Sequence, residues 1–93
     1  MLPIQHFASG VIAEIVRRQP ASRERTAFAW QIAVGSAIAR STTVELVDGV
    51  LNVNARDPRW GREVSRAADT ILARMQHLLG AGAVTSLNIV SDR

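Results

Sequence analysis

The chain has 93 residues, a formal net charge of +3 and no cysteine. This length fits one core, so we expect residues 1–93 to form a single domain. The absence of cysteine excludes disulfides and thiolate metal sites. The two histidines, His6 and His77, lie too far apart in the sequence to predict a zinc site. No metal and no other cofactor is therefore expected.

The sequence predicts neither a secretory signal nor a membrane span. Met1-Leu2-Pro3 lacks the basic region that opens a signal peptide. The uncharged stretch at residues 26–39 is shorter than the roughly 20 apolar residues that a membrane-spanning helix needs. We expect a cytoplasmic protein with no membrane partner, and association with the nucleoid is left open.

Helical periodicity dominates the first half of the chain. Apolar residues at helical spacing predict a helix over about residues 4–18, which Gln19-Pro20 ends. Ser22 is a predicted N-cap for a second helix over about residues 23–40. That helix is apolar nearly all round, which predicts a central position between the other helices and the sheet. The alternative is that part of it meets a partner or a second copy, forming a homodimer.

A β-hairpin is the strongest local prediction. Asp48-Gly49 separates two β-rich segments, at about residues 43–47 and 50–56. Asp-Gly is favoured in a type I′ turn because both central residues need a positive φ. Leu51, Val53 and Ala55 alternate with polar residues, so the second strand should have one buried face and one exposed face.

The third helix and the last strand complete the order α-α-β-β-α-β. Asp57 is a predicted N-cap with Pro58 at the first helical position, and the helix should run over about residues 58–79. Its apolar residues fall on one arc, and a final strand is expected at about residues 84–90. The fold class is α+β, with a three-stranded sheet packed by helices.

Every basic residue is an arginine, and two groups of them are candidate nucleic-acid contacts. The first group lies opposite the apolar arc of the third helix and extends to the end of the second strand: Arg56, Arg59, Arg62, Arg66 and Arg74. The second surrounds the turn between the first two helices: Arg17, Arg18, Arg23 and Arg25. Arginine binds phosphate through two parallel hydrogen bonds and stacks on bases. The alternative is that both groups are solvated surface.

Two tryptophans are candidate anchors, and no catalytic arrangement is found. Trp30 and Trp60 lie on apolar sides of their helices, which favours anchoring in the core or on a partner; stacking of Trp60 on a base is the alternative. Neither a glycine-rich phosphate loop nor a Ser/His/Asp set is present, and the carboxylates are scattered. The sequence therefore predicts no catalytic residues and no enzyme.

The segment from Trp30 to Val90 resembles the DciA family of bacterial proteins. The matching pattern comprises Trp30, Val34-Gly35, Ile38-Ala39-Arg40-Ser41-Thr42, Leu46-Val47-Asp48-Gly49-Val50-Leu51-Asn52-Val53, Asp57-Pro58-Arg59-Trp60-Gly61-Arg62-Glu63-Val64, Ile71-Leu72 and Leu79-Gly80. The ordered set is more specific than any one of its parts. The sequence departs from many members at Thr42-Thr43, where they carry a proline. It also ends at Arg93, whereas many members carry a basic or disordered extension.

The resemblance implies a role in loading or operating a DnaB-type replicative helicase, and binding of single-stranded or tailed DNA. It also implies a K-homology-like domain, although the sequence contains no GxxG loop of the kind that clamps backbone in such domains. The leading hypothesis is thus a non-enzymatic DNA-replication accessory protein that contacts DNA and the helicase. The alternatives are a protein–protein module that uses residues 23–40, and an RNA-binding K-homology-like domain.

Overall fold

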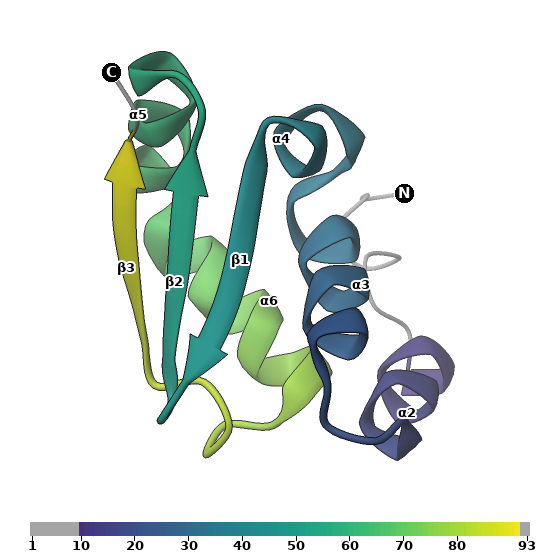
Figure 1. Ribbon diagram of the computed structural model, residues 1–93. Helices are drawn as coiled ribbons and strands as arrows, with labels where there is room; N and C mark the ends of the chain where they lie inside the picture. Colours follow the sequence, from purple (N-terminus) through teal and green to yellow (C-terminus); the bar gives the residue numbers. More distant parts are fainter. Residues whose placement is uncertain (1–9, 92–93) are drawn as a thin grey trace.

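The computed structural model describes residues 10–91 (Figure 1). The first six elements are α2 (Gly10–Arg18), α3 (Arg23–Val34), α4 (Ser36–Arg40), β1 (Thr42–Val47), β2 (Val50–Ala55) and α5 (Pro58–Arg66). They are followed by α6 (Ala68–Leu79) and β3 (Ser86–Ser91). The protein is a small α+β domain whose helices pack on a mixed sheet, in the expected order of helices and strands. Residues 4–9 of the first expected helix, and His6, lie outside the described residues.

The three strands have the order β1-β2-β3. β1 pairs antiparallel with β2, and β3 pairs in parallel with β2. The parallel connection runs through α5 and α6, which Figure 1 shows behind the sheet. No helix lies over the front of the sheet in that view, and the outward-facing Thr43, Glu45 and Asn88 are exposed. One face of the sheet is therefore buried under helices and the other is open.

The predicted hairpin is confirmed. Asp48 has φ 51° and Gly49 has φ 83°, as a type I′ turn requires, and Val47 pairs with Val50 across the turn. Leu51, Val53 and Ala55 are buried, with relative exposures of at most 1%. The alternation in the sequence therefore identified the buried face of β2 correctly.

The expected helix over residues 23–40 is interrupted at Gly35. Its φ of 86° ends α3, and its N–H donates to the Gln31 carbonyl. Residues with a Cβ rarely adopt this positive φ, whereas glycine does so readily. A right-handed helix needs a negative φ, so it ends at Gly35. α4 then redirects the chain into β1. There the buried Thr42 hydroxyl accepts from Trp30 Nε1 at 2.9 Å and donates to the Ile38 carbonyl at 2.7 Å.

The central helix is α6 rather than residues 23–40. α6 contacts α2, α3, α5 and β3, and buries Ile71, Met75, Leu78 and Leu79. α3 buries one stripe, Thr26, Ala29, Trp30 and Ala33, toward α6 and β1. Phe28, on another side of α3, is 52% exposed. α3 thus lies between α6 and the sheet, as expected, but it is not buried on all sides, because Phe28 is exposed.

A second break divides the expected helix over residues 58–79. Ala67 leaves the helical conformation with ψ 14°, and α6 begins at the next residue. α5 covers the ends of β2 and β3, where Gly61 is buried and a Cβ would contact the Ala55 and Ser91 side chains. α6 then crosses behind the sheet (Figure 1). A single straight helix cannot meet both surfaces, so the helix changes direction between them.

Candidate functional site

The N-terminus of α5 is fixed by local sequence. The Asp57 carboxylate accepts a hydrogen bond from the Arg59 backbone N–H at 2.8 Å, and Pro58 occupies the first helical position. This start directs Gly61 and Val64 to the buried side of α5. Arg59, Arg62 and Arg66 are spaced three and four residues apart, and all three are exposed. The predicted outward position is therefore confirmed for Arg59, Arg62 and Arg66.

We call Arg56, Arg59, Arg62 and Arg66 the α5 arginine face. Arg66 pairs with Glu63 at 3.5 Å, and the Arg59 guanidinium lies over the Trp60 ring at 5.4 Å from its centroid. The side chains of Arg56 and Arg62 are exposed and make no ion pair within residues 10–91. Two of the four cations are thus fully available to an anionic ligand. The Arg66 pair is 74% exposed on the arginine side, so solvent screens it strongly.

Arg40 lies at the same end of the molecule as Arg56, and it was not among the predicted nucleic-acid contacts. The Arg56 N–H donates to the Ser41 carbonyl at 3.1 Å, which continues the β1–β2 register by one pair. Arg40 is exposed at the end of α4, one residue before Ser41. A two-residue hairpin fixes this register, so counting outward from Asp48-Gly49 would have placed Arg40 near Arg56.

Arg74 does not lie on the α5 arginine face. Its Nη1 donates to the Ala33 carbonyl at 2.9 Å, and the side chain is half-buried between α6 and α3. The break at Ala67 changes the direction of the helix, so Arg74 leaves the outward row formed by the arginines of α5, although the predicted apolar side of α6 is the buried one. The expected outward position of Arg74 is wrong, and its contact joins two helices.

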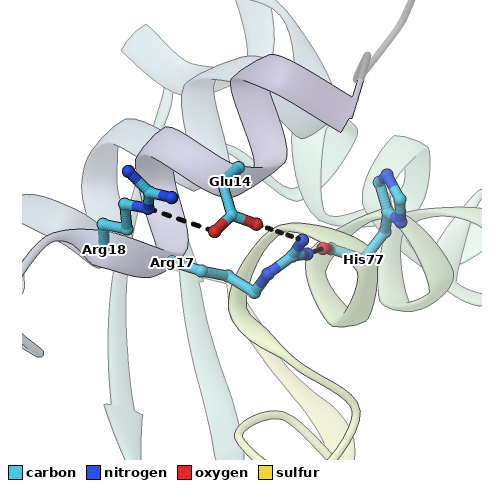
Figure 2. A network of polar contacts seen from close by, with 4 residues as sticks. All are labelled: Glu14, Arg17, Arg18 and His77. Atoms are coloured by element: carbon cyan, nitrogen blue, oxygen red, sulfur yellow. Dashed lines mark hydrogen bonds and ion pairs between the residues drawn. The ribbon is translucent and has the colours of Figure 1, made fainter.

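The second arginine group is largely engaged in contacts within the fold (Figure 2). Arg18 Nε and Arg17 Nη2 bind the two oxygens of Glu14 at 3.1 and 3.4 Å. Arg17 Nη1 also donates to the His77 carbonyl at 2.6 Å, and so joins α2 to the C-terminal turn of α6. The hydrogen bond from Arg18, followed by that from Arg17, lowers the pKa of the Glu14 carboxyl below its ordinary 4.5.

The remaining two arginines of this group, Arg23 and Arg25, differ in how far they are exposed to solvent. Arg25 is half-buried, and its Nη1 donates to the Gln19 carbonyl at 3.1 Å. Arg23 is exposed at the first residue of α3. Figure 1 places α2 and α5 at opposite ends of the molecule, so the two expected arginine groups do not form one continuous surface.

The two tryptophans occupy different environments. Trp30 is 2% exposed, lies in the core and donates its Nε1–H to Thr42. Trp60 is only half-buried and carries Arg59 on its ring. Part of the Trp60 indole is therefore accessible next to the exposed arginines of α5.

No set of three or more His, Asp or Glu residues within residues 10–91 could hold a metal ion. None of the helices in the same range is long and apolar enough to cross a membrane.

The described chain is thus a small α+β domain with arginines gathered on the outside of one short helix. It belongs to the DciA family: the family model described as Dna[CI] antecedent, DciA matches residues 3–89. A UPF0232 protein from Mycolicibacterium smegmatis is 36% identical over 62 residues, which cover 66% of this chain and 32% of that protein. The chain therefore spans about a third of the length of this curated relative.

Proposed function

We propose that this chain is a non-enzymatic DNA-replication accessory protein of the cytoplasm. In this proposal it binds single-stranded or tailed DNA through the α5 arginine face and contacts a DnaB-type replicative helicase. Membership of the DciA family supports a role with the replicative helicase in general. The observation that carries the DNA contact is the row of exposed arginines on α5, beside the half-buried Trp60.

The charges on this face suit a phosphate backbone. Its four arginines are accompanied by two carboxylates, Asp57 and Glu63, which leaves an excess of positive charge. Arg62 and Arg56 can each bind a phosphate, and Trp60 can stack on a base next to them. The contact needs no GxxG loop, because the guanidinium groups take the place of backbone N–H donors.

A DNA titration tests the first half of the proposal. Labelled tailed DNA is titrated with the chain at two salt concentrations. If about four arginines replace counterions on a single strand, log K falls with log salt at a slope near −2.8, or roughly 50-fold between about 50 and 200 mM. Competition with an RNA of the same sequence separates DNA binding from a general single-strand preference. Salt-independent binding, or none, contradicts a contact through the arginines.

Matched charge reversals assign the surface. Arg62→Glu is expected to weaken DNA binding by about tenfold or more, because it removes one cation and adds a repulsive charge. Arg18→Glu makes the same charge change at the opposite end of the molecule, on a side chain that is 76% exposed. Equal losses in both variants would indicate that net charge, rather than the α5 arginine face, determines binding.

The helicase contact is tested separately by retention of the cognate DnaB-type helicase on the immobilised chain, at a salt concentration that abolishes DNA binding. Retention is expected for the unmodified chain and for Arg62→Glu. No retention would contradict this half of the proposal and leave the DNA result unaffected.

A second candidate function is a protein–protein module that does not bind nucleic acid. The observation that favours it is the exposed apolar surface of α2 and α3: Val11 is 69% exposed, Ile15 51% and Phe28 52%. Ile15, Pro20 and Phe28 line a shallow pocket of about 350 Å³. Phe28→Ser would abolish a partner contact or homodimer made there and leave DNA binding unchanged. Sedimentation measured over a range of concentrations distinguishes a homodimer from a monomer.

A further inference from the structure

β1 is an edge strand, and its unpaired backbone groups can be identified from the register. In an antiparallel pair, opposite residues alternate between hydrogen-bonded and non-hydrogen-bonded pairs. The bond from the Arg56 N–H to the Ser41 carbonyl fixes this alternation, because Ser41 and Arg56 lie opposite each other when the register is extended. Val44 and Leu46 therefore belong to non-hydrogen-bonded pairs. Their N–H and C=O groups point away from β2, and no other hydrogen bond to them is found within residues 10–91.

A groove lies along this edge, between β1 and α3. Two adjoining pockets of about 320 and 390 Å³ form it, and they share Arg23 and Val44 in their linings. The first extends along β1 to Leu46, and the second extends to Trp30 and Thr42. The free donors and acceptors of β1 thus line a groove whose opposite wall is α3.

The chemistry of this groove matches a polypeptide backbone. Val44 and Leu46 each present one donor and one acceptor, about 6.6 Å apart along the strand, which is the repeat of an extended chain. The groove also contains apolar surface from Ala27, Trp30 and Leu46, which can take the alternate side chains of an added strand.

The charges in the groove favour a peptide over a nucleic acid. Its charged side chains are Arg23, Arg25, Glu24 and Glu45, so the positive and negative charges balance. Two carboxylates along the path would repel successive phosphates. In contrast, the α5 arginine face has an excess of positive charge.

We propose that the groove between β1 and α3 binds an extended segment of a partner protein, which pairs with β1 as an additional strand. The backbone groups of Val44 and Leu46 supply affinity, and the apolar lining selects small apolar residues at alternate positions. This site is separate from the α5 arginine face and does not depend on DNA binding.

Amide exchange of the free protein is the first test. The amides of Val44 and Leu46 should exchange much faster than those of Glu45 and Val53, because the former face the groove and the latter lie in the paired part of the sheet. Slow exchange at Val44 and Leu46 in the monomer would mean that the edge is already paired, which overturns the proposal.

A peptide selection is the second test. Random peptides of about ten residues, long enough to pair with β1, are displayed on phage and selected against the whole chain, and the enriched peptide is synthesised. It should protect the Val44 and Leu46 amides and give short interproton distances to β1. Protection at β3 or at Phe28 instead, or no enriched peptide, overturns the proposal. The proposal is also overturned if a single-stranded oligonucleotide, or a second copy of the chain at high concentration, protects the Val44 and Leu46 amides.

Matched variants identify the groove as the binding site. Ala27 is exposed and lines the groove, whereas Ala73 is exposed on α6 and lies outside it. Ala27→Arg fills the groove and is expected to weaken the selected peptide at least about tenfold. Ala73→Arg adds the same charge and should leave binding unchanged, as should Arg62→Glu. Equal binding to all three variants would overturn the proposal.

Discussion

At the scale of single residues, backbone conformation explains why certain positions accept few amino acids. Asp48 and Gly49 both adopt positive φ, and Gly49 also lies beside Thr85. The Gly49 carbonyl accepts from the Thr85 N–H at 2.7 Å and from the Thr85 hydroxyl at 3.1 Å. The hairpin turn therefore holds the start of β3 as well as joining β1 to β2.

Gly49→Ala is predicted to destabilise the fold by about 1–2 kcal/mol, because alanine resists a positive φ and its Cβ would press on Thr85. The measurement is urea unfolding followed by tryptophan fluorescence. Gly82→Ala is the matched control, since Gly82 has no positive φ and a Cβ there meets nothing within 4 Å. Equal effects of the two substitutions would show that the turn conformation contributes nothing specific.

Arg74 and Arg40 show how far a side chain's surroundings depend on distant parts of the chain. Arg74 was expected to face outward, yet its partner is a carbonyl 41 residues earlier in the sequence. Arg40 was not selected, yet the strand register places it beside Arg56. Local patterns predict which residues are charged and roughly where they face. They do not predict which distant backbone groups accept hydrogen bonds from these side chains.

At the scale of elements, α2 is held on α6 by apolar packing and by one polar contact. Ala13 and Val16 are fully buried, while Arg17 donates to the His77 carbonyl at the C-terminal end of α6. A cation at this position also interacts favourably with the negative end of the helix dipole. Glu14 binds both Arg17 and Arg18, and so orients the arginine that makes the contact (Figure 2).

This network predicts a dependence on acid pH. The pKa of Glu14 is lowered in the folded state, so its contribution to stability is present above the ordinary value of 4.5 and is lost as the pH falls through the folded value. An NMR titration of the Glu14 carboxyl should therefore give a midpoint below 4.5. Arg18→Gln should raise that midpoint toward the ordinary value, because Arg18 is the main cause of the shift. A midpoint at or above the ordinary value would contradict the network.

The two helix breaks also belong to this scale. Glycine is a poor helix former, and the positive φ of Gly35 allows α4 to turn toward β1. Nothing comparable indicated the break at Ala67, because alanine is the best helix former. The chain leaves the helix there because α5 must cover the ends of β2 and β3 while α6 crosses behind the sheet.

At the scale of the whole molecule, one core joins helices and sheet. Leu51 and Val53 from β2 pack in the same cluster as Val16, Trp30, Val64, Leu78 and Val84. α6 is the element around which the others assemble, because it contacts α2, α3, α5 and β3. A substitution that removes a buried side chain of α6 should therefore lower the stability of the whole domain.

Leu78→Ala is predicted to lower the free energy of unfolding by about 3 kcal/mol, because Leu78 is fully buried and a cavity would remain. Such a loss is a large fraction of the roughly 5–15 kcal/mol that holds a small domain together. Tryptophan fluorescence and far-ultraviolet circular dichroism should report one shared transition at lower urea. Thr70→Ala, at an exposed position of the same helix, should change stability by less than about 0.5 kcal/mol. A similarly small change for Leu78→Ala would contradict the central role of α6.

Four features could be predicted from the sequence: the fold class, the order of the elements, the hairpin turn and the outward row of Arg59, Arg62 and Arg66. These depend on interactions over a few residues: turn dihedrals, capping by Asp57, and the periods of helix and strand. Only the folded chain shows that Arg17 and Arg74 donate hydrogen bonds to distant carbonyls and that Phe28 is exposed. It also forms the groove between β1 and α3. Such features arise where segments distant in sequence contact each other, and local sequence patterns do not predict those contacts.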